Sequence, residues 1–302
     1  MKKLILLLLL SFSIATIAVG NVRVENAVQN NNDLRVRFLG TGSAGWSADN
    51  NDSELRRHSS ILVEGHILVD FTQSAVDMLP QGVSPDVVVY THSHGDHYNP
   101  SLALRIGVKE VYMSHTWLEK AQSDFERLSQ EMHLPMPRII PLYEGVPVVI
   151  GNVTFLPLPA NHFVSLQEQP LMYVIEKEGV RLLYATDTAG LTAKAARIAG
   201  VDAHDSKANP ITAIIMEATM GVEHEEDFRI FVHSTVGDVL RMVHVLQKTN
   251  RYTPPVNQPV YITHMYHKLH APHKELNETL PSPLQAAYDG MEVLFTCPDK
   301  QP

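Results

Sequence analysis

Residues 91–97 read THSHGDH and follow an apolar run that is typical of a buried strand. In an extended segment, residues two apart project to the same side, so His92 and His94 can face one metal ion. The glycine that follows permits a sharp bend, which directs Asp96 and His97 towards a second ion. Imidazole nitrogen and carboxylate oxygen are ligands that zinc and related metals use in catalytic sites. The stretch therefore predicts a metal site at the end of a strand.

Short apolar runs separated by glycine and proline turns indicate many strands and few helices. The runs that predict strands are 34–39, 60–64, 66–71, 86–90, 110–113, 146–150, 153–158, 171–176, 181–185, 211–217, 260–263 and 292–295. Helical patterning is clearest at 116–131 and 234–247. Strands that lie a turn apart favour two mostly antiparallel sheets packed together, with the helices outside.

The histidine-rich stretch resembles the signature of the metallo-β-lactamase-fold hydrolases, and the resemblance extends from about residue 34 to residue 296. It implies an α/β fold, a four-layer αββα sandwich, formed as one domain by residues 21–302. It also implies a centre of two divalent metal ions. Zinc is the metal expected there, with manganese or iron as alternatives, because the ligand types do not separate these ions.

Three further residues match the metal ligands of this family in their order along the chain. The resemblance implies that His162, in the PANH segment 159–162, completes the first ion with His92 and His94. Asp187 corresponds to an aspartate that bridges both ions, and His264 to the last ligand of the second ion. Each also has a simpler interpretation, as a loop histidine, a turn or cap residue, or a structural histidine at a strand end.

The beginning of the chain resembles the RNase Z and cyclic-phosphodiesterase branch of the family in the segments 40–45, 57–63 and 68–70. Within the last of these, we expect Asp70 to orient the histidine loop without binding metal. The glycine-rich turn 40–45 has two interpretations. Its amides could receive a phosphate oxygen, or it could be only a tight turn after a strand.

Glu217 and His233 match the same branch, in the segments EAT at 217–219 and HST at 233–235. A hydrogen bond from His233 to Glu217 would raise the basicity of the imidazole, which could then protonate a leaving alkoxide or stabilise phosphoryl oxygens. In the alternative interpretation, Ser234 caps a helix and His233 is only its surface neighbour. The short gap between the two segments and the lack of a basic tRNA-binding region argue against RNase Z activity itself.

The carboxylate at position 187 also bears on the reaction. The β-lactamases of this superfamily carry cysteine or serine there, whereas the only cysteine of this chain is Cys297. Asp187 thus argues against a β-lactamase, and Glu217 and His233 favour phosphate esters. We expect a metal-dependent phosphodiesterase that acts on a small or cyclic phosphodiester through a metal-bridging hydroxide positioned by Asp96 and Asp187. A lactone, thioester or other carboxyl-ester hydrolase is the main alternative, and a metal-binding protein without turnover is a minor one.

The first twenty residues predict export. Two lysines precede the apolar stretch 4–10, and a small-residue site, Ala-Val-Gly, ends at residue 20. We expect residues 1–20 to be a signal peptide and the mature protein to be soluble in the periplasm or outside the cell, without membrane attachment. A retained membrane anchor is the alternative, although the apolar stretch is short for a membrane span.

The charge of the chain favours a small-molecule substrate. Twenty-four lysines and arginines against 33 acidic residues give a net charge of −9, which becomes 22 − 33 = −11 without residues 1–20. Proteins that bind long nucleic acids usually carry a basic face, and no run rich in lysine or arginine is present. We therefore expect no long nucleic acid as partner. The sequence does not indicate an oligomeric state.

Overall fold

Two seven-stranded β-sheets form the centre of the protein in a computed structural model, which describes residues 32–46 and 55–298 except 203, 205–208, 223 and 225. In spatial order the first sheet contains β14 (Glu292–Phe295), β1 (Leu34–Gly40), β2 (Ser60–Val63), β3 (Ile67–Val69), β4 (Val87–Val89), β5 (Glu110–Ser114) and β6 (Arg138–Leu142). The second contains β13 (Leu284–Ala286), β12 (Val260–Thr263), β11 (Ala213–Glu217), β10 (Val180–Ala185), β9 (Leu171–Lys177), β8 (Val153–Pro159) and β7 (Val148–Ile150).

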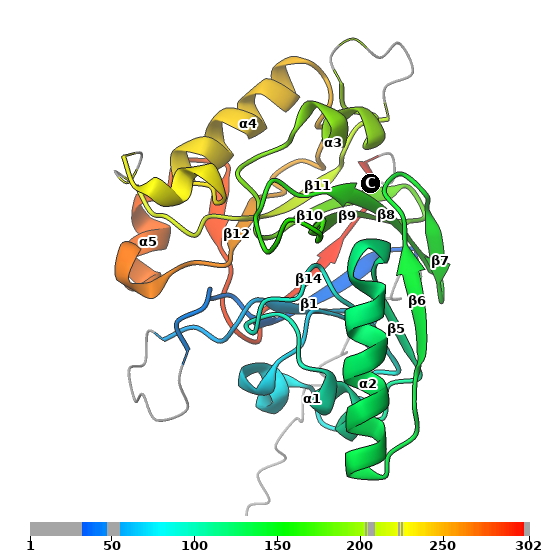
Figure 1. Cartoon of the computed structure of the whole chain (residues 1–302). Helices are drawn as coiled ribbons and strands as arrows, with labels where there is room; N and C mark the ends of the chain where they lie inside the picture. Colours follow the sequence, from blue (N-terminus) through cyan, green and yellow to red (C-terminus); the bar gives the residue numbers. More distant parts are fainter. Residues whose placement is uncertain are drawn as a thin grey trace, which may run out of the picture. The chain divides into compact units, whose positions relative to one another are not determined.

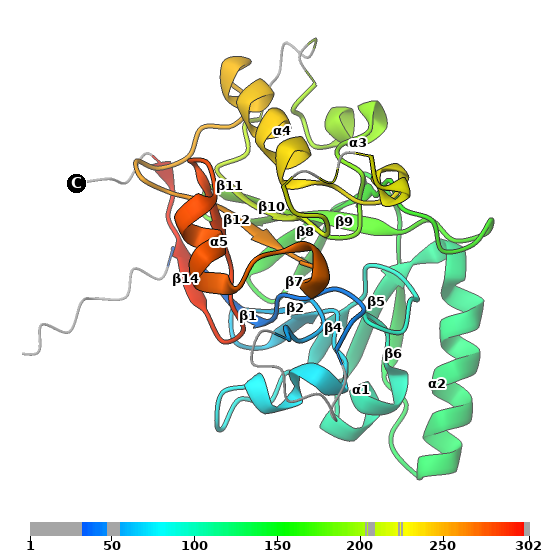
Figure 2. The same cartoon turned by 90° about the vertical axis from the view of Figure 1, so that its left-hand side faces the viewer.

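Helices cover the outer face of each sheet, so four layers result (Figures 1 and 2). The first sheet packs against α1 (Pro100–Ile106) and α2 (Leu118–Met132). The second packs against α3 (Ala193–Ile198), α4 (Val236–Lys248) and α5 (His273–Thr279). Four short 3-10 helices complete the secondary structure of the described residues: η1 (Gln73–Met78), η2 (His115–Trp117), η3 (Phe228–Phe231) and η4 (His267–Leu269). The predicted αββα sandwich is confirmed.

The two sheets repeat the same order of pairings. From β14 to β6, three antiparallel pairings are followed by three parallel ones. The same sequence of pairings runs from β7 to β13 in the second sheet. The sheets are thus mixed rather than mostly antiparallel as expected. The parallel half arises because crossovers that contain a helix connect its strands, whereas turns of two or three residues join β2 to β3, β7 to β8 and β9 to β10 as antiparallel pairs.

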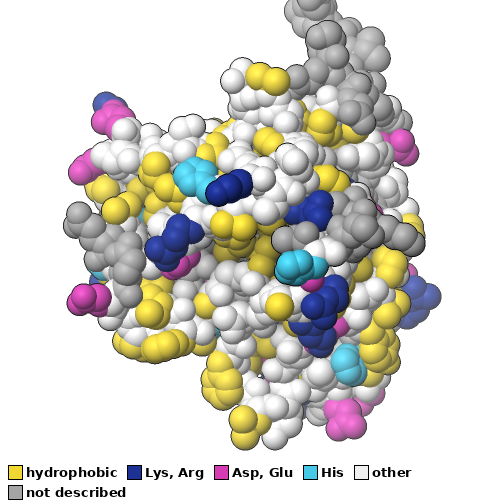
Figure 3. Space-filling view, turned by 90° about the horizontal axis from the view of Figure 1, so that it is seen from above, with side chains coloured by type: hydrophobic (Ala, Val, Ile, Leu, Met, Phe, Trp, Pro, Cys, Tyr) yellow, Lys and Arg dark blue, Asp and Glu magenta, His cyan; other side chains and the backbone are white. Residues whose placement is uncertain are grey.

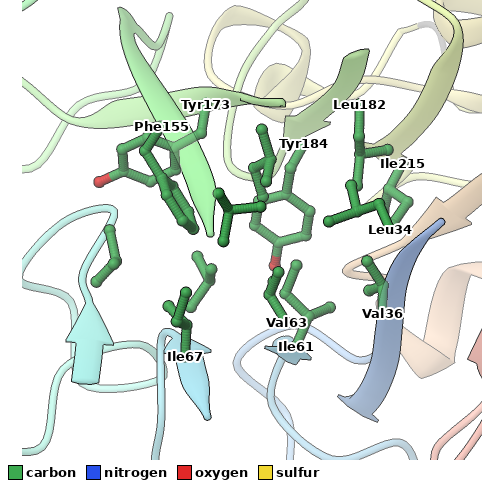
Figure 4. Packing of buried hydrophobic residues seen from close by; sticks show 14 of the residues in the cluster. Leu34, Val36, Ile61, Val63, Ile67, Phe155, Tyr173, Leu182, Tyr184 and Ile215 are labelled. Atoms are coloured by element: carbon green, nitrogen blue, oxygen red, sulfur yellow. The ribbon is translucent and has the colours of Figure 1, made fainter. Parts of the chain in front are cut away.

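The core between the sheets is apolar and closed. Alternate residues of β1 and β10, such as Leu34, Val36, Leu182 and Tyr184, are fully buried and point towards the opposite sheet (Figure 4). Period-two alternation places every second side chain of a strand on the same face, which explains why these residues share one cluster. This packing fixes the strand ends from which the candidate site is built.

The elements that the sequence did not predict are short or atypical. Strand β6 lies at the edge of the first sheet and contains Pro141. Proline has no amide proton to donate, and an edge strand tolerates this because one of its sides pairs with no other strand. Strand β13 has three residues, and α1, α3 and α5 have six or seven each. The predicted helices at 116–131 and 234–247 are confirmed as α2 and α4.

The predicted signal peptide, residues 1–20, lies outside the described residues. Within the described part of the chain, every helix is too short or too polar to cross a bilayer.

Candidate metal centre

The candidate site gathers residues that directly follow four strands. The segment 92–97 comes after β4, His162 after β8, Asp187 after β10 and His264 after β12. Each strand packs in the closed core, so the loop that follows it leaves the sandwich at a fixed position. The histidines from these distant segments lie within ring contact of one another, as His92 does with His162 at 5.1 Å and His97 with His264 at 5.3 Å.

Three imidazoles form a first donor set, His92, His94 and His162. The Nδ1 atom of His94 lies 3.0 Å from Nε2 of His92 and 3.2 Å from Nε2 of His162. Burial lowers the pKa of all three groups, which keeps them neutral. Zinc lies about 2.0–2.1 Å from an imidazole nitrogen, so nitrogens this close together can share one ion.

A second donor set consists of Asp96, His97 and His264. The Nε2 atoms of the two histidines are buried and make no hydrogen bond of good geometry, although an oxygen of Asp187 lies close to both. They lie 3.5 and 3.7 Å, respectively, from Oδ2 of Asp96. A buried ring nitrogen without a hydrogen-bonding partner is costly, and a metal ion supplies the missing partner.

Asp187 lies between the two donor sets. Its Oδ2 atom is 2.8 Å from Nε2 of His97 and 3.2 Å from Nε2 of His264, whereas Oδ1 faces Nε2 of His162 at 3.9 Å. Burial raises the pKa of this carboxyl, but His264 and His97 outweigh that effect and hold it well below its usual range. Asp187 is therefore an ionised carboxylate whose two oxygens face different donor sets.

The donor chemistry fits divalent cations. Each set offers three side-chain ligands, and the carboxylate of Asp187 is available to both. Around His97, the carboxylates of Asp187, Asp96 and Asp70 raise the imidazole pKa well above its ordinary value, although burial opposes this. Three carboxylates around one buried group form an excess of negative charge, which cations neutralise.

Backbone strain marks three positions of the site. Asp70, Asp187 and His264 each follow a strand and adopt left-handed φ angles of 55°, 46° and 52°. Residues other than glycine rarely adopt this conformation, and they retain it where the surrounding structure over-determines it. Asp70 and Asp187 follow β3 and β10, which occupy equivalent positions in the two repeated sheets.

Asp70, which the sequence analysis assigned to orienting the histidine segment, lies in contact with that segment. Its fully buried carboxylate accepts hydrogen bonds from the amide and hydroxyl of Thr91, both at 2.8 Å, and from Nδ1 of His97 at 2.7 Å. Thr91 Oγ1 in turn accepts a hydrogen bond from Nδ1 of His92 at 2.9 Å. Both imidazoles thereby keep a proton on Nδ1 and are oriented with Nε2 towards the other donor atoms of the site.

Glu217 and His233 form the predicted pair beside this centre. Nδ1 of His233 lies 3.0 Å from Oε1 of Glu217 and 3.6 Å from Oδ1 of Asp187. Burial lowers the pKa of His233, but the Glu217 carboxylate outweighs burial and raises the pKa to about 9. Ser234 does not cap α4, because Thr235 and Asp238 form the capping box of that helix. Ser234 instead donates to the carbonyl of Thr188 at 2.8 Å.

Two supporting residues were not singled out from the sequence. Thr219 contacts Nδ1 of His264 at 2.8 Å and Nδ1 of His233 at 3.2 Å, and it donates to Oε2 of Glu217. Its place two residues after Glu217 was the only signal. Glu168 accepts hydrogen bonds from the amide and the hydroxyl of Ser93, at 2.7 and 2.6 Å. Its separation of 75 residues from Ser93 left no local pattern to find.

The structure favours one interpretation of the glycine-rich turn and corrects the expectation about Gly95. The amides of Gly42 and Ser43 donate to the carbonyls of other segments, and that of Gly45 to Ser43, so the turn is tight and these three amides are not free for phosphate. Gly95 is not required for the bend after His94, because its φ is not positive and an added Cβ would contact nothing within 4 Å. The bend is a helical turn, in which the amide of Tyr98 donates to the carbonyl of His94 at 2.9 Å.

The chain belongs to the β-lactamase superfamily domain family, whose model matches residues 68–252. A curated metal-dependent hydrolase of Thermococcus kodakarensis is 28% identical over 144 residues, which are 43% of this chain and 58% of that protein. The chain thus spans little more than half of that relative's length.

Among solved structures, a diphosphatase of the PhnP family superimposes with a TM-score of 0.61 at 19% identity and covers 87% of this chain and 97% of its own. The human short-form tRNase Z has a TM-score of 0.57 at 17% identity, over 87% of this chain and 99% of its own. At such low identity these likenesses establish the fold, and the activity has to be argued from the site.

Proposed function

We propose that the protein is an exported hydrolase that holds two divalent metal ions and cleaves a small or cyclic phosphodiester into a phosphomonoester and an alcohol. The observation that carries this proposal is the position of Asp187. One oxygen of its carboxylate is 2.8 Å from the second donor set and the other faces the first set at 3.9 Å. Two-metal hydrolysis uses ions about 3.5–4 Å apart, and a bridging carboxylate maintains that separation.

The residues of the chain have separate roles in this proposal. His92, His94 and His162 would hold one ion, and Asp96, His97 and His264 the other, with Asp187 shared. When bound, two such ions lower the pKa of a coordinated water towards neutrality and offset charge on the phosphoryl oxygens. The side chain of Asp96 is 13% exposed, against 4% for Asp187, so Asp96 is better placed to orient the attacking water.

The pair of His233 and Glu217 favours a phosphodiester over a carboxylic ester. The transition state of hydroxide attack on a phosphodiester carries two negative charges, whereas that of attack on a carboxylic ester carries one, so a cationic imidazole beside the centre stabilises the former more. Nδ1 of His233 is held by Glu217, so Nε2 is the atom that donates a proton to the departing alkoxide. The names of the two structural neighbours, a diphosphatase and a tRNase Z, both denote cleavage of phosphate linkages.

The surface and the N-terminal sequence support a small substrate outside the cytoplasm. On the face shown in Figure 3, lysine and arginine side chains of the described residues are dispersed among hydrophobic, acidic and uncharged ones. A long polyanion usually binds to a continuous basic surface. The net charge of −9 also disfavours the binding of a polyanion. The lysines and apolar stretch of residues 1–20 are the basis for export.

Metal analysis of the purified protein, followed by a substrate panel, tests the proposal. We expect two metal equivalents per chain and hydrolysis of bis(4-nitrophenyl) phosphate or of cyclic nucleotides, with lactones and thioesters turned over far more slowly. His94→Ala should abolish the activity, whereas His244→Ala, at an exposed position of α4, should leave it unchanged. Faster turnover of a lactone or thioester than of every phosphodiester would overturn the phosphodiesterase assignment and leave the metal centre intact.

A further inference from the structure

A pocket of about 400 Å³ lies directly beside the metal centre. It is formed by the loop after β10, the short helix η3 and the first two turns of α4. The residues that line it are Ala189, Gly190, Leu191, Ile230, His233, Ser234, Asp238, Arg241 and Met242. Apart from His233, none of these lining residues belongs to the groups of side chains that could hold a metal ion.

His233 forms the wall that the pocket shares with the metal centre. Its Nδ1 atom is 3.6 Å from Oδ1 of Asp187, and its ring lies 4.9 Å from that of His162. The same side chain lines the pocket. A group bound in the pocket therefore meets His233 on one side while the rest of the substrate reaches the metal-binding residues on the other.

The walls of the pocket are held in place by hydrogen bonds of the chain. Ser234 Oγ accepts from the amide of Gly190 at 3.2 Å and donates to the carbonyl of Thr188 at 2.8 Å. These bonds join the loop after β10 to the start of α4. Thr235 fixes the same helix start through its capping box with Asp238. The pocket is thus formed before a ligand arrives, as most small-molecule sites are.

The lining indicates what the pocket accepts. Ala189, Leu191, Ile230 and Met242 offer apolar contact. The guanidinium of Arg241 is paired with the Asp238 carboxylate, so these two charges offset each other. A cavity of about 150 Å³ lined by apolar side chains holds one benzene ring, so about 400 Å³ has room for two or three rings.

We infer that this pocket binds the alcohol half of the phosphodiester, and that Met242 and Leu191 select an uncharged, mainly apolar group of up to two or three rings. The inference rests on the proposed function. In the reaction, water loses a proton to solvent, and the resulting hydroxide forms a new bond to phosphorus while the bond from phosphorus to the alcohol oxygen breaks. The alkoxide takes a proton from Nε2 of His233, which regains one from solvent, and the alcohol leaves from the pocket.

Narrowing the pocket tests the selectivity. The substrates are methyl 4-nitrophenyl phosphate and methyl 4-nitro-1-naphthyl phosphate, which differ only in the ring of the leaving alcohol. We expect Met242→Trp and Leu191→Trp to lower kcat/KM for the naphthyl ester at least tenfold, mainly through KM, and for the phenyl ester less than threefold. Val245→Trp, at a 60% exposed position of α4 outside the pocket, should change neither. An equal loss for both esters in both pocket variants would overturn the inference.

A binding measurement separates this inference from the proposed function. With ¹³C-methyl methionine in the full chain, 1-naphthol should shift the Met242 methyl signal, assigned from Met242→Leu, and leave that of Met136 unmoved. A shift of the Met242 signal in a protein that hydrolyses no phosphodiester would support the pocket while the phosphodiesterase proposal fails. A Met242 signal that stays unmoved up to the solubility limit of 1-naphthol would overturn the inference.

Discussion

Oδ2 of Asp70 lies 2.7 Å from Nδ1 of His97, and both side chains are fully buried. Asp70 follows β3, and Asp187, which approaches the opposite nitrogen of the same imidazole at 2.8 Å, follows β10. These strands are equivalent in the two repeated sheets. His97 is thus held between two aspartates of equivalent position, one that orients the ring and one that is available to metal.

Asp70→Asn should weaken metal binding without removing a ligand. The amide cannot accept every hydrogen bond that the carboxylate accepts from Thr91 and His97, so the His97 ring loses its fixed orientation. Loss of such a supporting contact typically costs 10–100-fold in metal affinity. Competition with a chromophoric chelator measures the change. Asp77→Asn, at an exposed ion pair with Arg57, is the control and should bind metal as the wild type does.

His233→Gln should lower turnover while metal content stays at the wild-type value. General acid catalysis by a positioned side chain contributes about 10²–10⁴-fold, so a loss of kcat in that range is expected. Single-turnover kinetics combined with metal analysis checks this. A variant that retained full kcat would show that His233 is a structural neighbour of the site and not part of its chemistry.

Thr219 should affect both proton donation by His233 and metal binding by the second donor set. Its hydroxyl contacts Nδ1 of His233 and Nδ1 of His264, and it donates to Glu217. Thr219→Val keeps the shape but removes the hydroxyl, so both metal affinity and kcat should fall. Thr219→Ser restores the hydroxyl and should recover both. If Thr219→Val lowered only the melting temperature, the contact would be structural.

The sequence indicated the candidate metal ligands more readily than the residues that hydrogen-bond to the histidine segment. Ligands such as His92 and His264 immediately follow strands, so local pattern and order along the chain suffice to find them. Glu168 reaches Ser93 only through the tertiary fold, from a loop that carries no periodic signal. The pocket beside His233 has the same origin, since its walls come from the loop after β10, from η3 and from α4.

The parallel half of each sheet was missed for a related reason. A continuous apolar run identifies a buried strand such as β11 but does not by itself fix the direction of its neighbours. That direction depends on the crossovers, and α1 and α3 are too short to show a clear helical period. The mixed topology therefore appears only once the connections are known.

His270 should make stability depend on pH. Burial lowers its pKa to about 4, and Nε2 contacts the carbonyl of Ala218 at 2.7 Å. Because the unfolded chain binds the proton near pH 6.5 and the folded chain only near pH 4, stability falls as pH decreases through this window. The contribution is about 3 kcal/mol, from a difference of about 2.5 pKa units at 1.36 kcal/mol per unit.

The check is denaturant unfolding of the wild type and His270→Gln between pH 7 and pH 4, roughly the window that the His270 pKa defines. The glutamine amide can still donate to the Ala218 carbonyl but does not titrate, so the variant should lose less stability on acidification. Parallel stability curves for the two proteins would show that His270 does not contribute to the pH dependence.

Substitution by alanine should destabilise the fold at Gly40 and leave its stability unchanged at Gly95. A Cβ on Gly40 would lie 2.0 Å from the carbonyl oxygen of His58, a backbone atom that cannot move aside without disturbing the pairing of β1 with β2. Gly40→Ala should therefore destabilise the fold by about 3 kcal/mol, the upper part of the range for overpacking. In a domain of this size that lowers the melting temperature by about 6–12 °C.

A Cβ on Gly95 meets nothing within 4 Å, although the residue lies between His94 and Asp96. Gly95→Ala should thus keep the melting temperature and bind two metal equivalents, and calorimetry with metal analysis of both variants decides the matter. Loss of metal in Gly95→Ala at an unchanged melting temperature would mean that the bend after His94 needs glycine after all.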